Sequence, residues 1–222
     1  MLNIFSMYEG TEAIIAFLAF FIAIIIALSF HEFAHAYTAH IQGDLTPKTY
    51  GRLTLNPIAH IDPIGMLMLL FVGFGWAKPV PVSPLKFKHY RRGFFIVSVA
   101  GVVVNFLFFL LFTVVNILIL SGKIPLDTNA SIGLFIYFLV NFLLTINLSL
   151  AIFNLIPIAP LDGFNILTVF FKHDNAFLKF LRDYGQWILL ALLVSGIVEE
   201  VMFFLYNLIA TPITAFFARL LF

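Results

Sequence analysis

The sequence predicts an all-α polytopic membrane protein: a bundle of about four to six helices with a short re-entrant segment and small β-like loop elements near the cytoplasmic face. Apolar residues make up 62% of the 222 residues and charged residues only 10%, against about 45–50% and about 25% in soluble domains. The apolar residues gather in stretches long enough to span a bilayer, which takes about 20 residues. Five of the 12 basic residues lie in one loop that has no acidic residue, a pattern typical of cytoplasmic loops.

Four apolar stretches account for the helices expected in the N-terminal part. Their approximate limits are Ala13–Ile41, Ile64–Trp76, Gly93–Leu120 and Ile132–Ile156. The second is short and rich in glycine, so we interpret it as re-entrant or interfacial. A further stretch, Trp187–Val198, precedes Glu199 and Glu200, which are expected to mark a water-exposed break. The tail Val201–Phe222, which contains Pro212, is either two helices or one broken helix with an interfacial segment.

The loop from Ala77 to Arg92 sets the expected orientation. It contains five basic residues and no acidic residue, which places it in the cytoplasm and the N-terminus outside the cell. The protein is then a multi-pass protein of the cell membrane. This orientation is consistent along the chain only if Ile64–Trp76 does not cross the membrane. We expect a single domain over residues 1–222, with a core at 12–170 and C-terminal helical segments at 178–222.

Two segments near the cytoplasmic face are predicted to be extended. Lys48–Pro57 partly alternates apolar and polar residues, and the prolines of Pro79–Pro84 exclude helix. Such segments could present an unpaired edge to an extended peptide, although ordinary interfacial loops explain the same pattern.

Composition excludes several functional classes. The chain has no cysteine, which rules out disulfides, thiol nucleophiles and cysteine-bound metal centres. The net charge is +1 and no long basic run is present, so no nucleic-acid partner is expected.

The first apolar stretch contains the motif His31-Glu32-Phe33-Ala34-His35. Residues four apart lie on one face of a helix, so the two imidazoles can bind one metal ion. Glu32 is offset from that face and can reach the water held by the metal as a general base. Ionisable residues within a membrane span are costly and usually functional. Histidines bonded to neighbouring helices are the alternative, which leaves Glu32 unexplained.

The face that carries the two histidines is polar only toward its C-terminal end. Thr38 and Gln42 continue it beyond His35, whereas the preceding part of the face is apolar. If the helix ends near Gln42, His35 lies about 10 Å and His31 about 16 Å from that end. We therefore expect a site within the membrane that opens to water on the cytoplasmic side.

A third ligand is expected, because catalytic zinc usually has three protein ligands. Asp162 fits, since it follows the stretch Ile132–Ile156 and two prolines release the chain from helical geometry. Its position alone suits a helix N-cap equally well. Asn154 shares a helical face with Asn147 and could donate to a substrate oxyanion, although spacing alone favours a contact between helices.

These residues resemble the site-2 protease family of intramembrane zinc metalloproteases. The resemblance lies in His31–His35 and in the run Asn154–Gly163. Gly51–Pro57, Asp62–Gly65 and Gly73–Pro84 resemble the compact prokaryotic branch of that family, without PDZ or CBS modules. The resemblance covers nearly the whole chain and is weakest in the C-terminal tail.

The resemblance implies a role for each matching residue. His31, His35 and Asp162 would be the ligands of one zinc ion per chain. Glu32 would be the general base and acid, and Asn154 would hold the substrate or its tetrahedral intermediate.

The resemblance also implies the partners, namely the lipid bilayer and a transmembrane protein substrate that is cleaved within or near it. Lys48–Pro57 would correspond to the β element that presents the unwound substrate. One departure, a valine after Gly101 where many relatives have proline, affects local helix shape. The alternatives are a catalytically silent membrane scaffold of the same fold and, less favoured, a metal-dependent transporter. A regulatory membrane protein or a homo-oligomer is left open.

Overall fold

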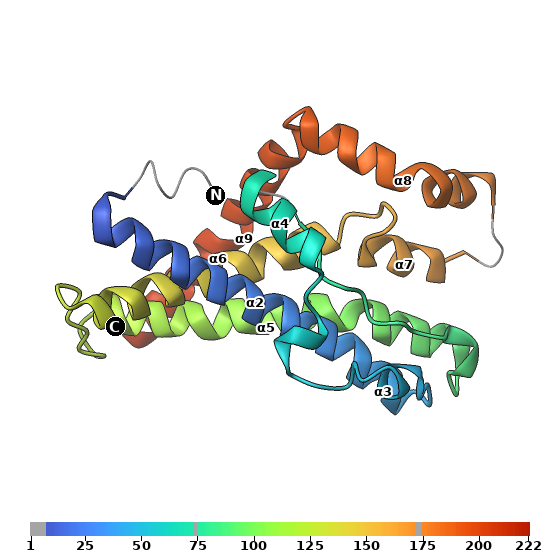
Figure 1. The fold of residues 1–222 in the computed structure, drawn as a ribbon, viewed down its shortest axis with the longest axis horizontal. Coiled ribbons are helices and arrows are strands. Elements are labelled where there is room, and N and C mark those ends of the chain that lie inside the picture. Colours follow the sequence, from blue (N-terminus) through green and yellow to red (C-terminus); the bar gives the residue numbers. More distant parts are fainter. Residues whose placement is uncertain (1–7, 73–74, 172–174) are drawn as a thin grey trace.

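Four helices are long and apolar enough to cross a membrane. The computed structural model describes residues 8–72, 75–171 and 175–222. The four helices are α2 (Gly10–Ile41), α5 (Tyr90–Leu120), α6 (Ser131–Asn154) and α9 (Ile197–Leu221) (Figure 1). The described residues form no sheet, so the predicted all-α class is confirmed. The chain is a multi-pass membrane protein.

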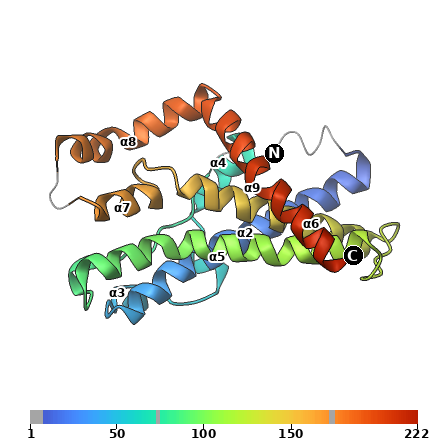
Figure 2. The ribbon, with the colours of Figure 1, turned by 180° about the vertical axis from the view of Figure 1, so that it is seen from behind.

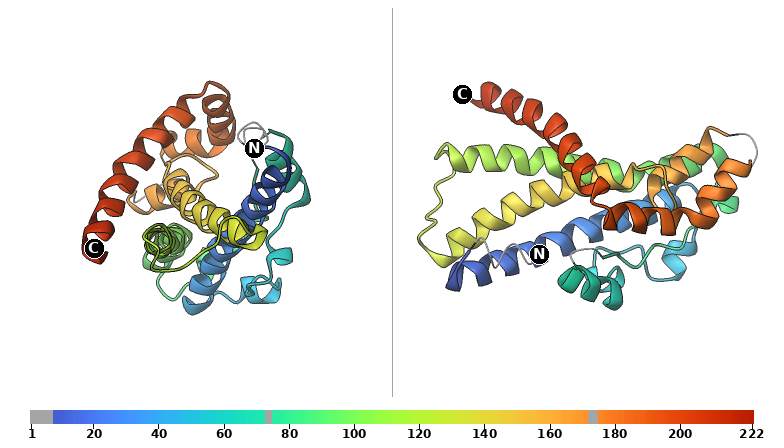
Figure 3. Two further views of the ribbon diagram at one scale, coloured as in Figure 1. Left: turned by 90° about the vertical axis from the view of Figure 1, so that its left-hand side faces the viewer. Right: turned by 90° about the horizontal axis from the view of Figure 1, so that it is seen from above.

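The centre of the bundle is formed by α2, α5 and α6, which pack against one another. Figure 3 (left) shows α5 nearly end-on, with α2 and α6 crossing obliquely beside it. On α2, small residues recur every three or four positions and are fully buried: Ala16, Ala19, Ala23 and Ala27. Phe138 of α6 packs on the first two, and Leu143 and Ile146 pack on the others. Small residues allow helices in a membrane to approach closely, so α2 and α6 lie close together.

The short helix α4 (Pro63–Val72) has ten residues. It is therefore about 15 Å long, half of the roughly 30 Å of a bilayer core, and cannot cross. This agrees with the predicted re-entrant or interfacial segment, of which Gly73 lies outside the described residues. Two 3-10 turns, η1 (Pro57–Ala59) and η2 (Pro84–Lys86), lie in the same long connection between α2 and α5.

The prediction that Lys48–Pro57 is extended was wrong. The segment begins within the single helical turn α3 (Thr46–Thr49). Gly51 then has a φ of +67°, a left-handed conformation that interrupts any strand. Within the described residues, the β-like elements reduce to one bridge between Ile61 and Ala77. Local turn formation thus prevails over a weak alternating pattern.

The C-terminal part begins with α7 (Asp162–Val169) and α8 (Ala176–Val194). Figure 2 shows α7 between α5 and α8. The break expected at Glu199 and Glu200 was misplaced, because the chain turns at Gly196, which has a φ of +79°. Both glutamates lie in the first turn of α9, where the helix dipole favours acidic groups. Pro212 lies inside α9, so the tail is one helix.

Candidate metal centre

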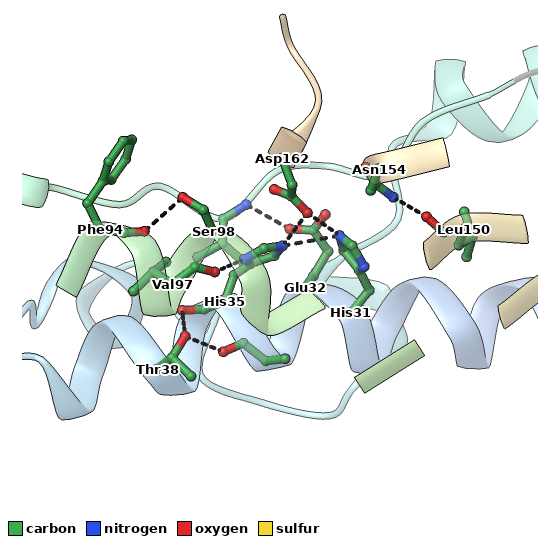
Figure 4. Close-up of polar contacts among 12 residues, drawn as sticks. His31, Glu32, His35, Thr38, Phe94, Val97, Ser98, Leu150, Asn154 and Asp162 are labelled. Atoms are coloured by element: carbon green, nitrogen blue, oxygen red, sulfur yellow. Dashed lines mark hydrogen bonds and ion pairs between the residues drawn. The ribbon is translucent and has the colours of Figure 1, made fainter. Parts of the chain in front are cut away.

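Two histidines lie one turn apart on the buried side of α2 (Figure 4). His31 is 5% exposed and His35 is 8% exposed. Their Nε2 atoms are 3.1 Å apart. This is the convergence that the four-residue spacing on a helix predicts.

Asp162 reaches the histidines from the first residue of α7. Its Oδ2 atom lies 3.3 Å from His31 Nε2 and 3.2 Å from His35 Nε2. The next residue, Gly163, packs directly on the loop after α6, because a Cβ atom there would lie 2.3 Å from the carbonyl oxygen of Leu155. Absence of a side chain at this position lets α7 begin close enough for its carboxylate to reach α2.

The three atoms form a group suited to a cation. His35 Nδ1 donates to the carbonyl oxygen of Val97 at 2.8 Å, so Nε2 of the neutral ring carries a lone pair. Asp162 Oδ2 is buried and has no hydrogen-bond donor among the described residues. Nε2 of His35 and Oδ2 of Asp162 therefore both only accept, and two such atoms 3.2 Å apart repel one another unless a cation lies between them. The separations of 3.1 to 3.3 Å among the three atoms match the roughly 3.3 Å between neighbouring ligands of tetrahedral zinc.

The helix α5 supplies the surface against which both imidazoles lie. Val97 binds His35 through its carbonyl group, and Gly101 follows one turn later. A Cβ atom at Gly101 would lie 2.4 Å from Cε1 of the His31 ring, so no side chain is compatible with this position of His31. Neither function was predicted, because a backbone carbonyl and an absent side chain leave no chemical motif.

Glu32 lies beside the two imidazoles in Figure 4. Its Oε2 atom accepts a hydrogen bond of 3.0 Å from the backbone N–H of Val80. Val80 belongs to the Pro79–Pro84 segment, which is free of helix until η2 begins, as predicted. The connection between α2 and α5 therefore touches the carboxylate directly.

Two buried side chains without a predicted role fasten the loop next to Val80. Arg52 is 7% exposed, and its guanidinium donates to the carbonyl groups of Ala59 and Lys78. His60 is 1% exposed and bonds the carbonyl oxygen of Thr54 through Nε2 at 2.8 Å. Its own carbonyl oxygen accepts from Lys78 N at 2.8 Å. Both residues thus hold the backbone two positions before Val80.

Asn154 is the last residue of α6 and stands at the edge of the site in Figure 4. Its Nδ2 atom donates to the carbonyl oxygen of Leu150 at 3.0 Å. Asn147 is fully buried and bonds Leu143 in the same way at 2.7 Å. Both amides therefore bond their own helix, and binding of substrate by Asn154 stays a prediction.

Comparison with known proteins gives consistent matches. The model of peptidase family M50 matches residues 116–196, a range that contains Asn154 and Asp162. The chain is 43% identical over 148 residues to a Bacillus subtilis (strain 168) protein named as a zinc metalloprotease, YwhC, covering 66% of each chain. It is 30% identical over 148 residues to a Mycolicibacterium smegmatis protein also named as a zinc metalloprotease, Rip2, covering 64% of this chain and 53% of the relative.

The match thus spans about two thirds of the first relative's length and about half of the second's. No solved structure matches significantly. Sequence identity, the family model and the group of histidines and aspartate agree. The chain therefore belongs to peptidase family M50, the site-2 protease family of zinc metalloproteases.

Proposed function

We propose that the protein is an intramembrane zinc metalloprotease that hydrolyses peptide bonds of transmembrane protein substrates. The observation that carries this proposal is the convergence of a carboxylate oxygen of α7 with two imidazole nitrogens of α2, a helix long enough to cross a membrane. Ionisable groups within a membrane span are energetically costly and are usually functional. Membership of family M50 supports the same activity.

His31, His35 and Asp162 would hold one zinc ion per chain. When bound, zinc supplies a water with a pKa of about 7 and polarises the scissile carbonyl. Glu32 would take the proton of the attacking water and deliver it to the leaving amine. The N–H of Val80 orients this carboxylate, and Asn154 would hold the substrate or its oxyanion by turning its amide away from α6.

We infer that the substrate reaches the site from the cytoplasmic side. His35 lies near the C-terminal end of α2, and Val80 of the basic Ala77–Arg92 loop binds Glu32. Loops rich in basic residues stay in the cytoplasm. The N-terminus would then lie outside the cell.

The test uses the purified full chain, with zinc measured by mass spectrometry and cleavage measured on a transmembrane reporter. Wild type should contain about one zinc per chain and cleave the reporter. Glu32→Gln should keep zinc but lower kcat by about 10²- to 10⁴-fold, because the proton acceptor is lost. His35→Ala should lose both zinc and cleavage.

The matched control is His89→Ala, which removes an exposed histidine and should behave as wild type. Full cleavage by Glu32→Gln would refute the mechanism. A wild-type protein that holds zinc but cleaves no transmembrane reporter would instead favour the catalytically silent scaffold.

A further inference from the structure

The two imidazoles of the metal site differ at Nδ1, the ring nitrogen that does not face Asp162. Nδ1 of His35 donates to the carbonyl oxygen of Val97 at 2.8 Å. Nδ1 of His31 is also buried, but it has no hydrogen-bond partner within the described residues. Figure 4 shows this nitrogen on the side of the ring turned away from His35. A histidine that binds zinc almost always donates its second N–H to an acceptor, so His31 requires one.

Asn105 of α5 carries a buried amide that can supply this acceptor. Its side chain is fully buried, and neither Oδ1 nor Nδ2 has a partner in the described part of the chain. By contrast, Asn141, Asn147 and Asn154 each donate to the carbonyl oxygen four residues earlier in α6. An amide buried without hydrogen bonds in a membrane-spanning helix is costly. Packing between helices therefore does not account for an amide at position 105.

Three residues spaced four apart on α5 face the metal site in turn. Val97 bonds His35, Gly101 lies against the ring of His31, and Asn105 follows one turn later on the same side of the helix. A Cβ atom at Gly101 would lie 2.6 Å from Nδ1 and 2.6 Å from Nε2 of His31, so the edge of the ring that carries both nitrogens lies at this position. Side chains on a helix lean toward its N-terminus. The amide of Asn105 therefore extends back over the turn that begins at Gly101, toward the His31 ring.

The facing part of α2 leaves room for this approach. His35 lies level with Val97 and His31 level with Gly101, so α2 and α5 run in opposite directions and the same spacing brings Asn105 level with Ala27. Ala27 is fully buried and has no polar side-chain atom. The unpartnered polar atom that α2 presents next to this level is Nδ1 of His31, one turn away.

We propose that Oδ1 of Asn105 accepts the hydrogen bond of His31 Nδ1 through one buried water, which makes Asn105 a positioning residue of the metal centre. Polar groups too far apart for a direct bond are commonly bridged in this way. Nδ1 of His31 and the two polar atoms of Asn105 supply the two to four partners that a buried water needs. The inference rests on the proposed zinc site. One helix, α5, would then orient both imidazoles, His35 through a carbonyl group and His31 through a side chain.

The test measures the zinc affinity of the purified full chain by competition with a chelator. Asn105→Leu removes the acceptor at nearly the same side-chain size and should weaken zinc binding by about 10- to 100-fold. Asn105→Ala should show the same loss, which guards against a leucine that does not fit. Asn105→Asp keeps an oxygen acceptor and should retain most of the affinity. The melting temperature of the metal-free Asn105→Leu protein should change little, because the amide has no direct protein partner to lose.

The matched control is Asn116→Leu, which makes the same substitution on α5 about 16 Å further along the helix. Its Oδ1 atom is likewise buried without a partner in the described segments, and the variant should bind zinc as wild type does. Unchanged zinc affinity in Asn105→Leu, or equal losses in Asn105→Leu and Asn105→Asp, would overturn the inference. A lower melting temperature of Asn105→Leu with normal zinc affinity would instead assign Asn105 to helix packing.

Failure of the proposed function gives a different result from failure of this inference. A wild-type protein that binds no zinc would refute the metal centre and the role of Asn105 together. A wild-type protein that binds zinc and depends on Asn105 for its affinity, but cleaves no transmembrane reporter, would refute the proposed activity and support the role of Asn105.

Discussion

His31 and His35 are oriented in different ways. A hydrogen bond to Val97 fixes the ring of His35. Nδ1 of His31 is buried and has no hydrogen-bond partner among the described residues, so packing against Gly101 positions that ring. Groups that orient a metal-binding imidazole typically change metal affinity by about 10- to 100-fold.

Gly101→Ala should therefore weaken zinc binding by about 10- to 100-fold, because the added methyl group would overlap the His31 ring. Zinc affinity can be measured by competition with a chelator, together with cleavage of the reporter. Val103→Ala, at an exposed position on the same helix, serves as the control and should bind zinc normally. Unchanged affinity in the Gly101 variant would show that His31 does not depend on this contact.

The geometry of this site was predictable where it follows from helix periodicity. The spacing of His31 and His35 places them on one face of any helix, and Asp162 follows a span that ends at the same depth. Val97 and Val80 contribute only backbone atoms, which every residue possesses. Such contacts depend on how helices pack and cannot be identified from a single sequence.

At the level of elements, Asp44 fastens the connection between α2 and α5. It is fully buried and accepts hydrogen bonds from the backbone N–H groups of Thr46 at 2.9 Å and Ser83 at 2.6 Å. Burial disfavours its charged form, but the hydrogen bonds from Thr46 and Ser83, assisted by Lys86, outweigh this and lower the pKa of Asp44. Ser83 lies three residues after Val80, so the same contact supports the segment that binds Glu32.

Asp44→Asn should lower the free energy of unfolding at pH 7 by about 1–3 kcal/mol, because hydrogen bonds to a charged acceptor are replaced. The folded-state pKa lies below the unfolded value of about 3.9. The contribution is therefore present above about pH 4 and is lost as the pH falls through the folded-state pKa. Thermal unfolding in detergent between pH 3 and pH 7 measures this difference.

Asp127→Asn, in an exposed loop, is the control and should leave the melting temperature nearly unchanged. A stability difference between wild type and Asp44→Asn that stays constant down to pH 3 would contradict the assigned role of the charge.

Elements were predictable to different degrees for physical reasons. The limits of α2, α5 and α6 follow from apolar length, which a bilayer demands of any span. Lys48–Pro57 was misjudged because its alternation is short, and Arg52 within it turns inward to bond the carbonyl groups of Ala59 and Lys78. The break was predicted at Glu199 and Glu200 because two consecutive acidic residues suggest exposure to water. The chain turns at Gly196 instead, because a glycine in the left-handed conformation ends a helix.

For the molecule as a whole, the proposed orientation can be tested directly because the chain has no cysteine. Asn129→Cys should react in intact cells with a thiol reagent that does not cross membranes. Lys88→Cys should react only after the cells are permeabilised. Both positions are exposed, so accessibility in the protein is matched. The reverse labelling pattern would place the basic loop outside the cell and contradict cytoplasmic access to the site.

The fully buried alanines of α2 have a mechanical consequence. A methyl group offers no rotamer that can adjust, so the separation of the α2 and α6 backbones is set at Ala16, Ala19, Ala23 and Ala27. His31 and His35 belong to α2, and Asp162 is connected to α6 by a short loop. Ala16 lies about 22 Å along the helix from His31. One bulky substitution there would widen the gap between the two halves of the metal site without touching any of its ligands.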